Sequence, residues 1–154
     1  MWEKLLTDSD GPYLELMAGA WSDNQPDYSW IQPYETKTVK QYFYPVRDLG
    51  GIKAANLDAA VNLEVDEKKR VATIAINTTR DFPEAAAYVC AWQPSRETTH
   101  FLEKALRIAP DKPFRAEVPL PPGFKREDLC VALHELDIGR KGPLRERWKR
   151  DIIN

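Results

Sequence analysis

The chain has 154 residues, enough for one ordinary domain with its own core but too few for a large enzyme. Its 22 basic and 24 acidic residues leave a formal net charge of −2, which excludes a bulk positive field that would attract nucleic acid or anionic lipid. No apolar run is long enough to span a bilayer, and the first residues lack the pattern of a secretory signal, so we expect a soluble chain with no membrane partner.

The first third of the chain carries two candidate strands that are separated by a long loop. Residues 12–18 form the first short apolar run, and residues 36–46 are the second candidate, while residues 2–7 are a weak helix candidate. Two strands and a loop cannot bury a core alone. We therefore expect residues 1–52 to pair with the rest of the chain, with a partner domain of a larger protein, or with a second copy in a homo-oligomer.

The clearest pattern of the sequence lies at residues 58–79. Apolar side chains alternate with small or polar ones on both sides of the charged stretch 66–70. Val61 and Leu63 share one face of the first run, and Asn62 and Glu64 share the other. This pattern predicts an antiparallel hairpin with one face in solvent.

Further short strands are expected at residues 86–92, 102–108, 114–120 and 129–136, with proline, glycine or aspartate in the turns between them. Residues 101–110 also have helical spacing, but we favour a strand because the neighbouring segments are all β. The 12 prolines are spread along the chain and would interrupt long helices. The sequence thus predicts an all-β chain with an antiparallel, immunoglobulin-like β-sandwich at residues 53–138, after a glycine-containing boundary at 49–57.

Residues 139–154 form a basic tail, of which 142–153 is a second weak helix candidate. Its six basic residues are Arg140, Lys141, Arg145, Arg147, Lys149 and Arg150. A run of this kind is typical of a solvated surface or a disordered end. Binding to nucleic acid is disfavoured, and a linker into further repeats is an alternative role for the tail.

The residues that most often carry catalysis or metals are few and scattered. Cys90 and Cys130 are the only cysteines, and we favour two buried free thiols over a single bridge between packed strands. His100 and His134 lie far from each other in sequence, so no metal site and no cofactor are expected. For His134 we favour a strand histidine on the wetter face over a catalytic role.

Three stretches, GPYLELMAGAW, IQPYETKTVKQYFYPVRDLGG and AANLDAAVNLEV, resemble an uncharacterised bacterial domain family that is often found before tetratricopeptide repeats. That family is distantly similar to the C-terminal part of the aldose 1-epimerase (galactose mutarotase-like) supersandwich. The resemblance implies that residues 11–51 are the end of such a supersandwich and that the β-sandwich follows it.

The resemblance also gives one residue a chemical role. Glu15 falls where the general base of the epimerases belongs, although its own alternation on the strand equally allows it to face solvent. Tyr34 stands where glycine is usual in that group, and the catalytic histidines would lie upstream of residue 1. We therefore expect this chain to be inactive as an enzyme by itself, with Glu15 as a remnant of the base.

The loop between the first two candidate strands combines aromatic rings with planar polar groups, as sugar-binding sites commonly do. The candidate ligand-binding residues are Glu15, Trp21, Asp23, Asn24, Tyr28, Trp30 and Tyr34. Packing of the same rings onto a sheet is the alternative. The leading hypothesis is a non-catalytic, carbohydrate-associated binding or accessory β-sandwich module of a larger protein. The rival hypotheses are a fragment of an aldose-1-epimerase-like enzyme and a structural protein–protein interaction module.

Overall fold

The alternating runs at residues 58–79 form the predicted hairpin. Strand β2 (Ala59–Asp66) pairs antiparallel with β3 (Val71–Thr78), in a register that runs from Ala59 opposite Thr78 to Asp66 opposite Val71. The Asp66 carboxylate accepts a hydrogen bond of 2.9 Å from the Lys69 amide and so closes the turn. Strands β1 (Ala54–Ala55) and β6 (Phe114–Pro119) extend this sheet to the order β1-β2-β3-β6.

The second sheet is built from the later runs of the sequence. Its strands are β4 (Phe82–Trp92), β5 (Thr98–Ile108), β7 (Leu129–Leu136) and β8 (Trp148–Ile153), in the order β5-β4-β7-β8. Short 3₁₀ helices at Arg126–Asp128 and Leu144–Arg147 precede β7 and β8. The strand preferred for residues 101–110 is therefore confirmed.

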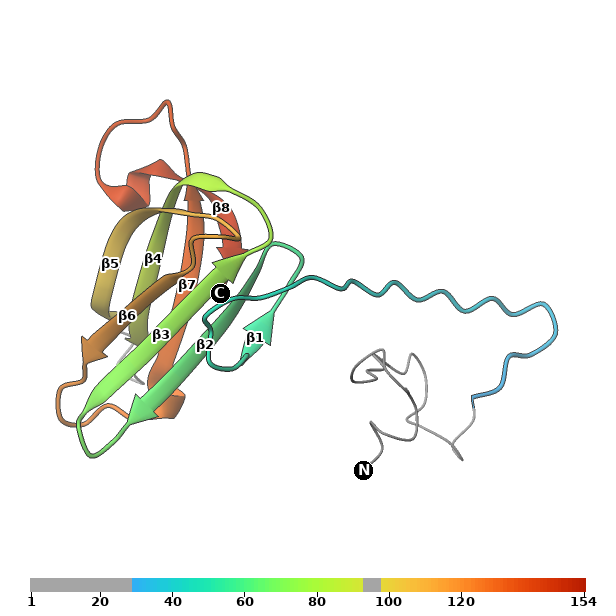
Figure 1. Cartoon of the computed structure of the whole chain (residues 1–154), viewed down its shortest axis with the longest axis horizontal. Coiled ribbons are helices and arrows are strands. Elements are labelled where there is room, and N and C mark those ends of the chain that lie inside the picture. The colour runs from blue at the N-terminus through green and yellow to red at the C-terminus, as the bar shows by residue number, and fades with distance from the viewer. Residues whose placement is uncertain (1–28, 93–97) are drawn as a thin grey trace, which may run out of the picture. The chain divides into compact units, whose positions relative to one another are not determined.

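These strands come from a computed structural model that describes residues 29–92 and 98–154 (Figure 1). The chain divides into two units, residues 1–41 and 42–154, and every described strand belongs to the second. All pairings between named strands are antiparallel. After β5 in the second sheet, the chain crosses back to the first sheet, where β6 pairs with β3. This crossover gives the Greek-key order of an immunoglobulin-like sandwich, so the all-β prediction is confirmed.

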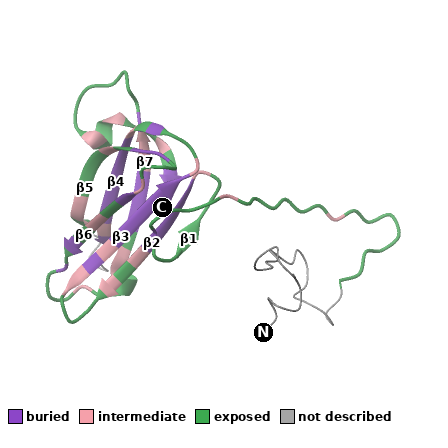
Figure 2. Ribbon diagram, in the orientation of Figure 1, coloured by how far each residue is buried: buried purple, intermediate pink, exposed green. Residues whose placement is uncertain are grey.

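The core lies between the two sheets, where the apolar faces of β2, β3, β4 and β7 meet (Figure 2). Its largest fully buried side chains include Phe82, Ile74, Ile76, Ile108 and Leu133. Because these positions alternate with outward-facing ones, the packing is the sheet-on-sheet contact that the period-two pattern predicts.

The outward face of the first hairpin differs from the prediction. Asn62 was expected in solvent, yet it is buried because the chain before β1 folds over it. Its amide donates a hydrogen bond of 2.9 Å to the carbonyl of Leu49, which itself packs on Ala60 and Ala75. Glu64 and Asp66, farther along the same face, stay exposed. The covering loop supplies the acceptor for the Asn62 Nδ2, while the Oδ1 of the same side chain has no hydrogen-bond partner among the described residues.

Two segments have a different secondary structure from the one expected. Residues 36–46, a strand candidate, are assigned no strand, and nearly all of them are exposed. Residues 148–153, expected as part of a solvated tail or a helix, are edge strand β8 and end in the buried pair Ile152 and Ile153. Pairing with β7 and burial of this apolar pair outweigh the charge of the segment. The candidate strand and helix in residues 1–28 lie outside the described residues.

The two cysteines form a disulfide, which corrects the expectation of two buried free thiols. Cys90 of β4 lies directly opposite Cys130 of β7, with their Cα atoms 5.3 Å apart. Cys130 is exposed and Cys90 is half-buried. The long-range register of β4 and β7 brings the thiols together, and that register is not visible in either local sequence.

In the described part of the chain, no helix is long and apolar enough to cross a bilayer.

Candidate functional site

The predicted ligand-binding residues are only partly described. Glu15, Trp21, Asp23, Asn24 and Tyr28 lie outside the described residues, and Trp30 and Tyr34 lie within them. Both described rings are exposed, Trp30 with 81% of its surface in solvent and Tyr34 fully. These two rings therefore do not pack onto a sheet, which was the alternative role expected for them.

A tight turn presents the Tyr34 ring. The Glu35 amide donates a hydrogen bond of 3.0 Å to the Gln32 carbonyl, and the Gln32 amide donates one of 2.8 Å to the Glu35 carboxylate. Pro33 occupies the second position of the turn, and Tyr34 has a φ of 67° at the third. That left-handed conformation favours glycine. Tyrosine at this position places a large ring at the tip of the turn instead.

The Lys37 ammonium closes the same loop from the other side. It donates hydrogen bonds of 2.9 Å to the Ser29 hydroxyl and 2.6 Å to the Trp30 carbonyl. These contacts hold the backbone beside Trp30 while the indole ring projects into solvent. The turn is therefore a small, internally bonded platform with exposed aromatic groups.

Large apolar side chains remain exposed beyond this turn. Ile31 and Val39 are exposed in the first unit, and Tyr42, Phe43 and Val46 are exposed at the start of the second, Phe43 with 65% of its surface in solvent. Several exposed apolar residues so close together in the sequence are typical of a segment that binds a partner. We call residues 36–46, which contain Val39, Tyr42, Phe43 and Val46, the apolar segment.

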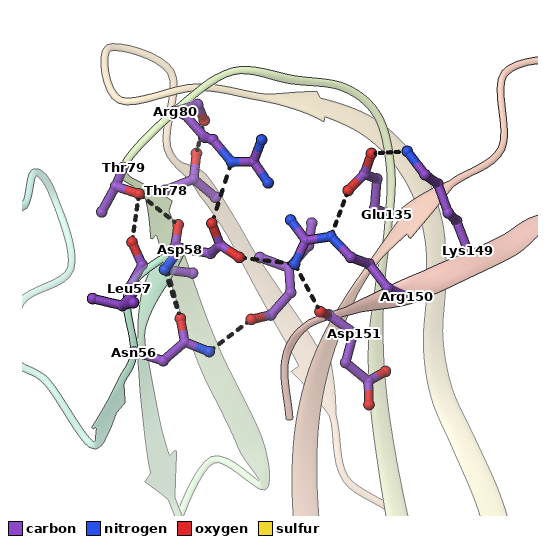
Figure 3. Close-up of polar contacts among 12 residues, drawn as sticks. Asn56, Leu57, Asp58, Thr78, Thr79, Arg80, Glu135, Lys149, Arg150 and Asp151 are labelled. Atoms are coloured by element: carbon purple, nitrogen blue, oxygen red, sulfur yellow. Dashed lines mark hydrogen bonds and ion pairs between the residues drawn. The ribbon is translucent and has the colours of Figure 1, made fainter.

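Two basic residues of β8, Lys149 and Arg150, are paired with acids (Figure 3). Arg150 lies 2.8 Å from both the Asp58 and the Glu135 carboxylates, and Lys149 lies 2.7 Å from Glu135. Arg80 approaches Asp58 at 3.2 Å. These contacts join β8 to the end of the other sheet, so the network acts as a clamp rather than as an open basic surface.

The clamp also fixes the charge of its acids. Burial raises the pKa of Asp58, but the ion pairs with Arg150 and Arg80 outweigh it and hold the pKa below its ordinary value. The hydrogen bond from Lys149, with that from Arg150, lowers the pKa of Glu135. Both carboxylates therefore stabilise the fold above their ordinary pKa values, and this contribution is lost as the pH falls through the lowered ones.

His134 lies in an aromatic pocket on the outer face of the second sheet. Its Nδ1 is 2.6 Å from an Asp151 carboxylate oxygen, and its ring lies 4.2 Å from Trp148 and 5.0 Å from Tyr88, between ring centroids. The close Nδ1 contact lacks the angle of a hydrogen bond. The side chain is only 12% exposed, so the expectation of a histidine on a wet face is wrong. The 3₁₀ helix residue Leu144 packs over this face.

We expect His134 to be neutral at pH 7. Burial lowers its pKa, and the Asp151 carboxylate opposes this shift without cancelling it. The neutral ring thus stabilises the fold above about pH 6.5, and the stabilisation is lost as the pH falls through the lowered pKa. An NMR titration checks this, and Asp151→Asn should lower the pKa further. A pKa that rises in Asp151→Asn would contradict the assignment.

A pocket of about 480 Å³ opens at the end of the sandwich, between the 66–70 turn and the loop before β7. Arg70 on its wall donates to the carbonyls of Leu120 and Pro121 and is therefore structural. Acidic and basic side chains both line the pocket, and they are Glu67, Glu127, Lys125 and Arg126. The pocket consequently selects no ligand by charge.

The strand order of the two sheets defines a β-sandwich domain of immunoglobulin-like topology. Residues 54–137 match the family described as the second domain of YphG-like proteins, and this match covers more than half of the chain. The chain belongs to that family. No solved structure matches the chain.

Sequence reasoning missed the contacts that involve β8. Trp148 and Asp151 complete the surroundings of His134, and Arg150 is the centre of the clamp. The signal that could have identified them is the apolar pair at residues 152 and 153, which is unusual in a solvated tail and typical of a strand that reaches the core.

Proposed function

We propose that the chain is a non-catalytic accessory module that docks onto a neighbouring β-domain of a larger YphG-like protein by adding the apolar segment as a strand. The observation that carries the proposal is the exposure of Val39, Tyr42, Phe43 and Val46 in a stretch that the sequence predicts to be a strand and that is assigned none. Strand addition supplies both backbone hydrogen bonds and pockets for alternate side chains.

The pattern of the segment supports a two-sided fit. In an extended chain Val39 and Phe43 lie on one face, and Tyr42 and Val46 lie on the other. A strand with apolar groups on both faces is typical of the interior of a sheet that is covered on both sides. The partner chemistry is therefore a β-sheet edge flanked by apolar surface, and a polar sheet edge would not complement it.

We take the partner to be the first domain of a YphG-like protein, because the family's description names this sandwich a second domain. The apolar segment ends at residue 46, before the matched residues begin at residue 54. The resemblance of residues 11–51 to the end of a mutarotase-like supersandwich supports a sandwich of that kind as the partner. In this proposal Glu15 would belong to the partner's fold, and the epimerase-fragment hypothesis requires the same arrangement plus a complete acid and base pair.

The test is association with the first domain of a YphG-like protein, expressed as a separate chain and followed by calorimetry. We expect Val39→Ser with Phe43→Ser to weaken binding by about 100-fold, because two apolar side chains lose their burial. Ile138→Ser is the matched control, since Ile138 is exposed on a different loop. Equal affinities for the double variant and the control, or no association of the unaltered chain, would overturn the proposal.

Carbohydrate recognition is the second candidate function, and the exposed turn with Trp30 and Tyr34 favours it. Flat rings stack on the apolar faces of sugars, and nearby polar groups bind the hydroxyls. The Glu35 carboxylate and the Ser29 hydroxyl lie in this turn. A site of this composition would bind a neutral oligosaccharide without any cofactor.

Titration with a panel of neutral oligosaccharides, followed by tryptophan fluorescence, tests this second function. We expect a saturable change that Trp30→Ala abolishes. Trp148→Phe is the control, because Trp148 is also exposed, with 50% of its surface in solvent, but packs on His134 in the sandwich. A flat signal across the panel, or an unaltered response in Trp30→Ala, would remove carbohydrate binding from consideration.

A further inference from the structure

The disulfide occupies an accessible row on the outer face of the second sheet. Cys90 and Cys130 lie opposite each other on the adjacent strands β4 and β7, and Cys130 is exposed to solvent. Leu144, in the 3₁₀ helix before β8, packs against the cluster that contains Tyr88 of β4 and Ala132 of β7. Tyr88 lies two residues before Cys90, and Ala132 lies two residues after Cys130. Exposed disulfides are the ones that exchange with external thiols, whereas structural disulfides are usually buried.

A histidine completes the same row. His100 of β5 is the cross-strand partner of Cys90, so the order across the sheet is His100, Cys90, Cys130. Directly opposed residues have Cβ atoms about 5 Å apart and point to the same face. His100 is exposed, and its ring lies 6.3 Å from Tyr88, which confirms its outward direction. An imidazolium beside a cysteine stabilises the thiolate.

The scaffold around this row does not depend on the disulfide for its alignment. Strands β4 and β7 are paired from Ala85 opposite Glu135 to Ala91 opposite Leu129. Val89 and Leu133, on the inner faces of the same strands, are fully buried in the core. The two thiols would therefore stay opposed after reduction, ready to form the bond again.

We propose that Cys90 and Cys130 form a thiol–disulfide exchange site that accepts electrons from an external dithiol. A thiolate of the dithiol attacks the exposed Cys130 sulfur, the S–S bond breaks, and the Cys90 sulfur leaves with the electron pair as a thiolate. The second thiolate of the dithiol attacks the mixed disulfide and releases Cys130. The dithiol is oxidised to a disulfide, and its two protons end on Cys90 and Cys130.

His100 acts in this proposal as a positioning residue for the departing charge. In its imidazolium form the ring stabilises the Cys90 thiolate, and the ring can relay one of the dithiol's two protons to that sulfur. The other titratable groups on this part of the face are Tyr88 and Glu103, which lie opposite each other, and Glu103 is paired with Arg145 at 3.6 Å. Histidine is the only one of these groups whose charge ordinarily changes between about pH 5 and 8.

The experiment reduces the folded full chain with dithiothreitol, well below the urea concentration of unfolding, and counts free thiols by alkylation and mass spectrometry. We expect reduction and reoxidation without loss of the β-sheet signal. His100→Ala should slow the exchange about threefold to tenfold and flatten its pH profile, because it removes the charge that favours the leaving thiolate. His100→Lys should retain most of the rate, and Lys104→Ala is a control on the same strand.

Two results would overturn the proposal. In one, reduction occurs only as fast as global unfolding and accelerates with urea, which would make the disulfide purely structural. In the other, His100→Ala leaves both the rate and the pH profile of exchange unchanged. Because the thiols are counted directly, both results are read independently of any docking or sugar binding.

Discussion

Replacing Phe82 with alanine is expected to lower the free energy of unfolding by about 3–5 kcal/mol. Phe82 begins β4, is only 2% exposed and belongs to the main core between the sheets. The guanidinium groups of Arg80 and Arg150 also lie over its ring, at 4.6 and 5.7 Å from the centroid. The substitution would therefore leave a cavity and also remove the surface on which the charged clamp rests.

Chemical denaturation measures this loss, and the chain provides a matched control. Phe43→Ala makes the same change in the apolar segment, where the side chain is exposed, so we expect it to alter stability by less than about 0.5 kcal/mol. Equal losses for the two variants would contradict the assignment of Phe82 to the core and of Phe43 to an open surface.

Removal of the disulfide is expected to have the next largest effect. The bond joins residues that are 40 positions apart and so restricts the unfolded chain. The double variant Cys90→Ala with Cys130→Ala should lose about 2–4 kcal/mol of unfolding free energy and still form the sandwich. The retained fold is expected because the strand pairs and the core on either side of the bond remain.

Guanidinium denaturation of the oxidised protein, the reduced protein and the double variant tests this prediction. The reduced protein and the double variant should have similar midpoints, both below that of the oxidised protein. If all three midpoints coincide, the bond contributes no stability. If the reduced protein is unfolded in buffer, reversible exchange on an intact sheet is excluded as well.

Local periodicity was sufficient to predict the strands whose pattern is set by the core. The β2–β3 hairpin follows from alternation and turn chemistry within the sequence itself, and its pairing buries the face that the pattern marks as apolar, whereas the strand at β5 follows only from its all-β neighbours. The class of fold follows from the number and spacing of such runs. These features depend only on near neighbours in the sequence.

The features that were missed depend on distant segments. Asn62 is buried because the loop at Leu49 folds over it, and Cys90 meets Cys130 through the register of two strands separated by β5 and β6. Strand β8 was obscured by its charges, which are neutralised by partners such as Asp58, far away in the sequence. Single-sequence patterns carry no information on such pairings.

The candidate site was predicted in part. Trp30 and Tyr34 are exposed, as a binding loop requires, but the other proposed ligands of that loop lie outside the described residues. The strand expected at residues 36–46 carries apolar residues on both faces and has no strand assignment. Within the described residues this segment is assigned to no strand, and its large apolar side chains are exposed. We propose a partner for it because exposed apolar surface favours association.

Hydrogen exchange at residues 36–46 tests the docking proposal most directly. In this chain alone, we expect the backbone amides of Val39, Tyr42 and Phe43 to exchange at the rates of an extended, solvated peptide. On addition of the first domain of a YphG-like protein, alternate amides should become protected, either those of Val39 and Phe43 or that of Tyr42, because only every second amide of an added edge strand faces the neighbouring strand. Protection in the isolated chain, or unchanged exchange in the mixture, would contradict the account.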